Sequence, residues 1–134
     1  MEIREYGEFR EEEIRALYQS AGWKLYIADM AVLKESFERS LLVLAAYQNG
    51  ELLGIIRTLG DGVNTVIIQD VVVFPQHQRK GVGTALVRAA LKHHGQVRQL
   101  LLVTDDTHET RAFYQSLGFR EFAQIGLCGF IKTG

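Results

Sequence analysis

The spacing of apolar residues changes near residue 41 of this chain, from a helical period to strand-like runs. Upstream, apolar side chains recur three and four positions apart, which places them on one face of a helix. The first helix is predicted from Glu11 to the glycine at 22, with its apolar face at Ile14, Leu17, Tyr18 and Ala21. The second is predicted after an N-cap at Asp29, with its apolar face at Met30, Leu33, Phe37 and Leu41. Residues 3–6 predict a short strand before both helices.

Downstream, three apolar runs rich in Val, Ile and Leu predict strands at 41–47, 52–59 and 65–74. The sequences QNGE and GDGVN separate these runs and are typical of turns. Strands joined by such short connections form an antiparallel meander.

Helical spacing returns after the glycines at 81 and 83, up to about His94, with apolar residues at Val82, Ala85, Leu86 and Ala89. A short buried strand is predicted at 100–103. Because a helix connects this strand to the meander, the two should pair in parallel.

A final helix is predicted at 109–117, with Asp106 or Thr107 as its N-cap. Gly118 suits the left-handed residue after the helix, with Phe119 folding back on Phe113 or Tyr114. Two last strands are predicted at 120–123 and 126–131. The expected fold class is therefore α+β, with one domain spanning residues 1–134. Helices are expected on a mixed, twisted sheet that has an antiparallel N-terminal meander and a parallel, splayed pair at its centre.

The composition limits the class of function. The chain has 134 residues, 47% of them hydrophobic, and 15 basic against 16 acidic side chains. A formal charge of −1 gives no support for binding nucleic acid. No segment has the pattern of a membrane span or a signal peptide, so neither a membrane nor an export route is expected. The one cysteine, Cys128, is expected to be a small core residue, and a cytoplasmic location follows from this cysteine usage.

The junction between the third strand of the meander and the next helix is the strongest candidate for a ligand site. Gln78, Gly81 and Gly83 form a Q-x-x-G-x-G pattern, with Arg79 and Lys80 inside it. Bare backbone at a helix N-terminus exposes N–H groups to a phosphate. The alternative is a tight turn with solvated basic residues. A dinucleotide fingerprint fails because Leu86 stands where its third glycine belongs, and the chain contains no Walker motif.

At this point the chain resembles the GNAT superfamily of acyl-CoA-dependent N-acetyltransferases. Two segments carry the resemblance: the VVVFP run followed by Q-x-x-G-x-G, and RAFYQSLGF at 111–119, which is similar to the family's F-Y-x-x-x-G-F segment. Together with the element between them, they cover residues 65–119. The resemblance implies a GNAT-like domain, an acetyl-CoA co-substrate and no metal.

The resemblance also implies a set of cofactor-binding positions. Backbone N–H groups of the glycine loop would hold the CoA pyrophosphate, and the preceding strand would splay from its parallel neighbour and pair with the pantetheine arm. The implied cofactor-binding residues are Val71, Val72, Val73, Gln78, Arg79, Lys80, Gly81, Val82, Gly83, Thr84, Thr107 and Tyr114. Thr107 departs from the family, which often has Asn at this position.

Acetyl transfer to an amine needs an oxyanion donor, an acid for the thiolate and a deprotonated amine. The backbone N–H of Val73 is the candidate oxyanion donor, and Tyr114 is the candidate acid because the family usually has a tyrosine there. The alternative for Tyr114 is a core aromatic. Asp70 interrupts an apolar strand and is either the base or a structural carboxylate paired with Arg57. Gln69 would orient substrate or water, and some family members use only a water chain.

The acceptor is expected near the first third of the chain and the turn at Asp61. Trp23 and Tyr26 either cover an acceptor pocket or pack the helices together. The sequence from Arg57 to 73 is similar to a branch that includes plant and bacterial serotonin N-acetyltransferases, which implies an arylalkylamine or another small amine, with Arg57 and Gln69 also at the substrate.

Two other functions stay open. One is acetylation of a protein lysine or N-terminus, and the other is acyl-CoA binding without turnover. Family members are often homodimers, so a dimer is open as well. The four histidines have no zinc-ligand spacing.

Overall fold

The computed structural model describes residues 1–134 and has the predicted α+β architecture, with a mixed sheet flanked by helices. The strands are β1 (Glu2–Glu5), β2 (Leu42–Gln48), β3 (Glu51–Gly60), β4 (Thr65–Val73) and β5 (Gln99–Leu102). The α-helices are α1 (Glu11–Ser20), α2 (Lys24–Ile27), α3 (Met30–Glu38), α4 (Val82–His93) and α5 (His108–Ser116). Two 3₁₀ turns, η1 (Pro75–His77) and η2 (Phe122–Ile125), complete the chain. The fold divides into two compact units, Met1–Val103 and Thr104–Gly134, which are described in turn.

The first unit contains the whole five-stranded sheet, in the order β1-β2-β3-β4-β5. The pairs β1–β2, β2–β3 and β3–β4 are antiparallel, and β4–β5 is parallel. The antiparallel meander and the parallel pair are as predicted, but the pair lies at the edge of the sheet and not at its centre, because no strand pairs with the other side of β5. Helix α4 is the crossover that makes the last pair parallel.

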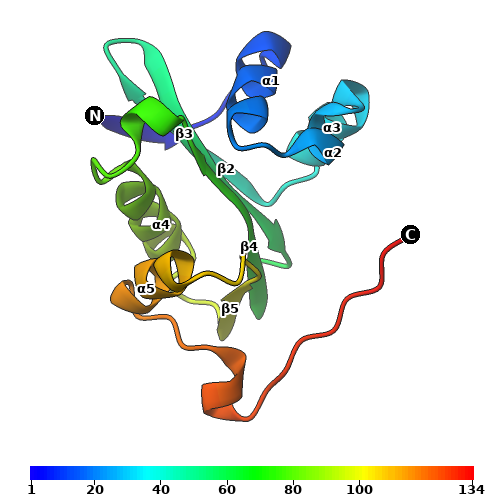
Figure 1. The fold of residues 1–134 in the computed structure, drawn as a ribbon, viewed down its shortest axis with the longest axis vertical. Helices are drawn as coiled ribbons and strands as arrows, with labels where there is room; N and C mark the ends of the chain where they lie inside the picture. The colour runs from blue at the N-terminus through cyan, green and yellow to red at the C-terminus, as the bar shows by residue number, and fades with distance from the viewer. The chain divides into compact units, whose positions relative to one another are not determined.

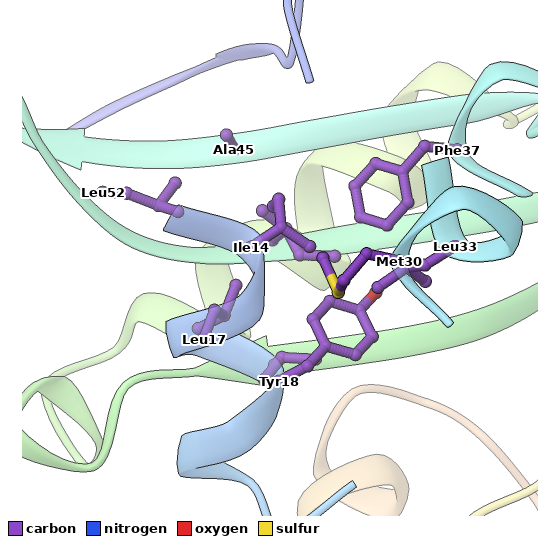
Figure 2. Packing of buried hydrophobic residues seen from close by; sticks show 10 residues of the cluster. Ile14, Leu17, Tyr18, Met30, Leu33, Phe37, Ala45 and Leu52 are labelled. Carbon is purple, nitrogen blue, oxygen red and sulfur yellow. The ribbon is translucent and has the colours of Figure 1, made fainter. Parts of the chain in front are cut away.

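Helices cover both faces of this sheet (Figure 1). Helices α1 and α3 lie over one face, where their apolar side chains gather over Ala45 and Leu52 of the strands (Figure 2). Helix α4 covers the opposite face with four buried side chains, Val82, Leu86, Val87 and Ala90. Each large apolar side chain so buried stabilises the fold by roughly 1.5–3 kcal/mol.

A β-bulge at Gln69 changes the face on which β4 presents its side chains. Ile68 stands opposite Thr58 of β3 and Asp70 stands opposite Arg57, so Gln69 is an extra residue with no partner on β3. A shift of one residue reverses the faces of a strand. As a result Ile68 packs on the α4 side with Thr58, while Asp70 points to the α1 side, where its carboxylate meets Tyr18.

The parallel pairing ends at the same place. The register of β4 with β5 runs from Thr65–Gln99 to Ile68–Leu102, whereas β4 itself continues to Val73. Beyond Ile68 one edge of β4 therefore has no neighbouring strand, because β5 ends at Leu102.

The second unit consists of α5, η2 and an extended C-terminal segment (Figure 1). Thr107 caps α5, since its hydroxyl accepts from the backbone N–H of Thr110 at 3.2 Å. Gly118 is left-handed with φ +95°, and Phe119 folds back on Tyr114 with their ring centroids 5.7 Å apart. The choice between Asp106 and Thr107 as the cap is thereby decided for Thr107.

Four expectations were wrong in detail. Residues 120–123 and 126–131 are not strands, because Glu121 and Gln124 form a capping box around the η2 turn and no strand pairs with the residues after it. Leu41 lies beyond α3, which ends at Glu38, and its N–H bonds to the carbonyl of Thr58. Cys128 is exposed and is not a core residue. The connection at 22–28 contains α2, which its four residues were too few to predict.

A polar pair is buried between the sheet and α4. The imidazole Nε2 of His94 lies 3.0 Å from the Thr58 hydroxyl, and Thr58 is fully buried. Burial, with a smaller contribution from His93, lowers the pKa of His94 below its ordinary value. The neutral imidazole is therefore the form that the fold favours.

We expect the free energy of unfolding to depend on pH through this histidine. Below about pH 6.5, the value for an unfolded histidine, the unfolded chain binds a proton that folded His94 resists. The contribution is thus present above that pH and is lost as the pH falls toward the lowered folded pKa. Urea unfolding at several pH values between 5 and 8 should show a weaker pH dependence for His94→Gln than for the native chain. His108→Gln, at an exposed position, is the control; equal slopes for the native chain and His94→Gln would contradict the prediction.

Candidate functional site

The carboxylate of Asp70 is the centre of a buried polar network in the first unit. Asp70 is 2% exposed and accepts three hydrogen bonds, each 2.8 Å long. The donors are the hydroxyl of Tyr18 from α1, the hydroxyl of Tyr26 from α2 and Nε of Arg57 from β3. Asp70 was expected to be either a catalytic base or a structural carboxylate paired with Arg57. The structure contains the ion pair with Arg57.

Arg57 is also nearly fully buried, at 3% exposure. Its Nη1 donates to the Ser40 hydroxyl at 3.2 Å, and its guanidinium lies within 6 Å of the Tyr26 and Phe37 ring centroids, at 5.9 and 5.7 Å. Burial alone would lower the pKa of Arg57, but the Asp70 carboxylate outweighs it and raises this pKa. Arg57 thus stays charged inside the core, where Asp70 neutralises it.

Three aromatic side chains close the network on the α1–α2 side. The rings of Tyr18, Trp23 and Tyr26 contact one another, with centroids between 5.1 and 5.8 Å apart. Burial, reinforced by the Asp70 carboxylate, raises the pKa of Tyr18, and burial raises that of Tyr26. Both hydroxyls therefore remain protonated donors at neutral pH.

Tyr26 and Gln69 form the solvent-facing end of this network. Gln69 is exposed, and its Nε2 donates to the Tyr26 hydroxyl at 3.2 Å. The bulge places Gln69 where β4 loses its parallel partner. The structure thus brings Tyr26, Arg57, Gln69 and Asp70 together, and Trp23 packs beside Tyr26.

The glycine turn gives α4 an open N-terminus. Gly81 is left-handed with φ +83°, and no side chain caps the helix. The first intrahelical hydrogen bond runs from the N–H of Ala85 to the carbonyl of Gly81, so the N–H groups of the three residues between them precede the helical ladder. Arg79, also left-handed at φ +62°, and Lys80 are exposed beside this end.

Strand alternation indicates which backbone groups of β4 point to its open edge. The N–H of Phe74 bonds to the carbonyl of Leu53 on the β3 side. Neighbouring residues of a strand direct their N–H and C=O groups to opposite edges, so those of Val71 and Val73 point away from β3. In agreement, the Val73 carbonyl accepts a hydrogen bond from the side chain of Gln78 at 3.1 Å.

The second unit holds Tyr114 and Thr107. Tyr114 packs edge-on against Phe113 and Phe119, and burial raises its pKa above the ordinary value. Its phenol is therefore protonated at neutral pH. The Thr107 hydroxyl already serves as the cap of α5 and also lies 2.9 Å from the Thr110 hydroxyl.

Asp61 has a structural task in the turn between β3 and β4. Its Oδ1 accepts from the backbone N–H groups of Val63, Asn64 and Thr65. These hydrogen bonds lower the pKa of Asp61, and the bond from the N–H of Thr65 has the largest effect. The carboxylate thus orders the turn as an Asx motif.

Tyr18 and Ser40 are members of the network that the sequence did not single out. Tyr18 occupied an apolar helix position, and the available signal was its hydroxyl, which needs a partner when buried. No cluster of three or more His, Cys, Asp or Glu side chains is arranged to hold a metal ion. None of the helices combines the length and apolar character needed to cross a bilayer.

Comparisons with known proteins agree with this architecture. The sequence profile of the Acetyltransferase (GNAT) family matches residues 6–119. A relative described as an uncharacterized N-acetyltransferase ycf52-like protein, from Prochlorococcus marinus, is 30% identical over 125 residues, which is 88% of this chain and 67% of the relative.

Solved structures give the same result. A GNAT family acetyltransferase from Streptococcus pneumoniae TIGR4 superposes with a TM-score of 0.88 at 30% identity, covering 99% of this chain and 97% of the other. An aminoglycoside 6'-acetyltransferase type Ii superposes with a TM-score of 0.74 at 25% identity, covering 90% of this chain and 83% of the other. The chain belongs to the GNAT family of acetyltransferases, whose members use acetyl-CoA as co-substrate.

The buried ion pair predicts a large effect of a small change. Asp70→Asn removes the charge that neutralises Arg57, and breaking a buried pair in this way costs about 3–5 kcal/mol. We expect the free energy of unfolding, measured by urea denaturation, to fall by that amount.

The matched control is Glu35→Gln, which removes the exposed pair of Glu35 with Arg39, 3.0 Å apart on α3. An exposed pair of this kind contributes roughly 0.3–0.5 kcal/mol. If Asp70→Asn lowered the free energy of unfolding no more than Glu35→Gln does, the Arg57–Asp70 pair would not contribute to stability as predicted.

Proposed function

We propose that this protein transfers an acetyl group from acetyl-CoA to the primary amine of a small molecule, by direct attack in a ternary complex. One observation carries the proposal: β4 loses its parallel partner after Ile68 and leads within a few residues to the uncapped, glycine-entered helix α4. The family uses acetyl-CoA, which has an extended pantetheine arm joined to a diphosphate. The open edge of β4 would bind the arm, and the N-terminus of α4 would bind the diphosphate.

The N-terminus of α4 fits the diphosphate of CoA. The N–H groups of Val82, Gly83 and Thr84 precede the helical hydrogen bonds, and the helix dipole adds partial positive charge there. Arg79 and Lys80 contribute full charges at the same end. Gly81 adopts a left-handed conformation just before α4, and its lack of a Cβ leaves the N-terminus of the helix open to a ligand.

The open edge of β4 fits the pantetheine arm, whose amides would pair with Val71 and Val73 as an added strand does. Gln78 supports this edge by bonding the Val73 carbonyl. The N–H of Val73 points to the same side, and we assign it to the thioester oxygen, where negative charge develops.

Tyr114 is assigned as the acid that protonates the departing thiolate. Burial raises the pKa of this phenol, so at neutral pH it holds the proton that the thiolate would take. Because the thiol formed has a pKa near 8.5 and is the stronger acid, the transfer is unfavourable in itself, and the later loss of that thiol with CoA would draw it forward. Thr107 is assigned to the cofactor as well. Its hydroxyl already accepts the capping hydrogen bond of α5, so it would contact the cofactor through its remaining hydrogen-bonding positions.

For Asp70 the geometry supports a positioning role over that of a direct base. Its carboxylate is buried, paired with Arg57 and bonded by two tyrosines, so its oxygens already have strong donors. Water at the exposed end of the network, beside Gln69 and Tyr26, is the alternative acceptor of the amine proton.

An arylalkylamine is the leading acceptor. The aromatic rings of Trp23 and Tyr26 beside a polar end suit a flat, apolar amine. Resemblance to the serotonin N-acetyltransferase branch supports this acceptor less strongly than the aromatic rings do. Arg57, Asp61 and Asp70, which carry the resemblance, all have structural partners that explain their presence.

A side chain added within the phosphate site should weaken CoA binding, and circular dichroism shows whether the variant stays folded. Gly83 lies in the first turn of α4, and Gly83→Val would place a branched side chain among the N–H groups. Losing one hydrogen bond to a charged group costs about 1.5–3 kcal/mol, which is roughly a tenfold to hundredfold loss of affinity. Calorimetry with CoA measures it.

The control for this change is Gly7→Val, because Gly7 has no atoms within 4 Å of an added Cβ and no left-handed φ. Undiminished affinity in Gly83→Val would place the diphosphate elsewhere, and no CoA binding by the native chain would remove the proposed function.

Release of free thiol from acetyl-CoA distinguishes the acceptor classes. We expect turnover with arylalkylamines and not with lysine peptides or peptide N-termini, and an aminoglycoside belongs in the panel because one similar structure is named for that activity. Tyr114→Phe should lower kcat by roughly 10²–10⁴ with little change in CoA affinity.

Tyr47→Phe is the matched control, since Tyr47 lies on β2 under the guanidinium of Arg4 and is not one of the donors to Asp70. Turnover with peptides would redirect the proposal to protein acetylation. Tight CoA binding with no thiol release on any amine would favour a binding protein, and an unaltered rate in Tyr114→Phe would remove that residue from the mechanism.

A further inference from the structure

We propose that Tyr26 and Gln69 recognise the amine substrate through two oxygen atoms that can only accept hydrogen bonds. This pair selects a primary amine, which has two N–H groups, over a secondary amine, which has one. The inference rests on the proposed function, because it takes the amine to bind at the exposed end of the Asp70 network. It adds the rule by which the site distinguishes amines of the same skeleton.

Asp70 fixes the direction of the Tyr26 hydroxyl. An ionised carboxylate accepts hydrogen bonds and donates none, so the tyrosine is the donor in the 2.8 Å contact between its hydroxyl and Oδ1 of Asp70. Arg57 and Tyr18 donate to the other oxygen of the same carboxylate. A phenol has one proton, and that of Tyr26 is committed to Asp70. The Tyr26 oxygen can therefore only accept from any further partner.

The Tyr26 hydroxyl in turn fixes the orientation of the Gln69 amide. Because the Tyr26 oxygen can only accept, the Gln69 atom that lies 3.2 Å from it has to be the amide nitrogen, Nε2. The amide oxygen, Oε1, is then the end of the side chain that is not bonded to Tyr26. Gln69 is exposed, so this second oxygen is open to a ligand.

The spacing of the two oxygens suits the two N–H groups of one nitrogen. The oxygen and nitrogen of an amide are roughly 2.2 Å apart, so Oε1 of Gln69 lies no more than about 5.4 Å from the Tyr26 oxygen. Two N–H···O bonds of about 2.9 Å from one nitrogen span roughly 4.7 Å between their acceptors. A primary amine can therefore bond both oxygens at once.

This mode of binding leaves the reactive part of the amine free. A neutral primary amine has two N–H groups and one lone pair, and the lone pair attacks the thioester. With both N–H groups bonded, only the lone pair has no partner in the site. A secondary amine has one N–H and leaves one of the two oxygens without a donor, which a site built for that bond disfavours.

The bulge brings the pair beside the edge that would bind the pantetheine arm. Gln69 has no partner on β3 and stands two residues before Val71, whose N–H and C=O point to the open edge of β4. Two residues of a strand span roughly 7 Å. The same strand would thus hold both the amine and the thiol carrier.

A comparison of two substrates tests the inference. Thiol release gives kcat/KM for a primary arylalkylamine and for its N-methyl derivative. We expect the native chain to prefer the primary amine roughly tenfold or more, because the derivative loses one hydrogen bond. A secondary amine is no weaker a nucleophile than a primary one, so chemical reactivity alone predicts no such preference.

Two variants separate hydrogen bonding from exclusion by size. Gln69→Leu removes one oxygen and Tyr26→Phe removes the other, so the primary amine should lose roughly tenfold in kcat/KM in each. The N-methyl amine should lose less, and the preference should fall toward one. A pocket that merely excludes the methyl group would keep the preference in both variants. Gln96→Leu, at an exposed glutamine in the turn after α4, is the matched control and should leave the preference unchanged.

Two results would overturn the inference alone. They are equal efficiency with both amines in the native chain, and a native preference that both variants retain. Circular dichroism shows whether each variant is folded. Gln69→Leu removes a single exposed hydrogen bond, so it remains informative if Tyr26→Phe, which also loses its bond to Asp70, does not fold.

Failure of the proposed function gives different results. If the native chain releases no thiol with any amine, the proposed function fails and this inference fails with it. If turnover is confined to lysine peptides, the arylalkylamine is the wrong substrate. The same preference is then measured with a lysine peptide and its N-methyllysine form, and equal efficiency with these two would overturn the inference.

Discussion

Strand β4 changes its relation to both neighbouring strands within three residues, and the first unit depends on that change. At Ile68 it loses β5, and at Gln69 the bulge reverses its faces against β3. Without the bulge, Asp70 would fall on the α4 face beside Thr58 and Ile68, where no cation lies. With it, the carboxylate reaches Arg57, while the apolar residues before it still pack under α4. The open edge and the polar network therefore begin within three residues of each other on β4.

The buried pair of Arg57 and Asp70 specifies this arrangement more than it stabilises it. Apolar residues of similar volume often replace a buried pair without loss of stability, whereas a pair with one partner missing is costly. A register slip of one residue would separate these charges and leave both unpaired, so the pair disfavours every other register. The two tyrosines extend the constraint, because they tie α1 and α2 to β4 through the same carboxylate.

The spacing of apolar residues predicted most helices and strands, because an element that buries one face has apolar residues at the period of that face. It could not predict the bulge, since residues 65–74 form one apolar run whatever the register of Gln69. It overestimated the C-terminal strands, because apolar residues such as Phe130 indicate strand tendency but do not supply a neighbour. For the site, a carboxylate in an apolar strand and an arginine on the strand before it suggested the ion pair. The tyrosine partner on α1 was hidden because its ring also fits a helix core, and only its hydroxyl distinguishes it.

The neutrality of the network bears on how an amine would react beside it. A lone buried carboxylate would bind an ammonium ion strongly and raise its pKa, which holds the nitrogen in the form that cannot attack a thioester. Arg57 cancels that charge, so under the proposed function the network would offer an amine aromatic surface and hydrogen-bonding groups without a net negative field. Partial desolvation among Trp23 and Tyr26 would lower the pKa of the bound amine. Under the proposed function, Asp70 would favour the reaction by being paired: an occupied carboxylate would leave the amine neutral, and the proton would depart to water instead of to a residue.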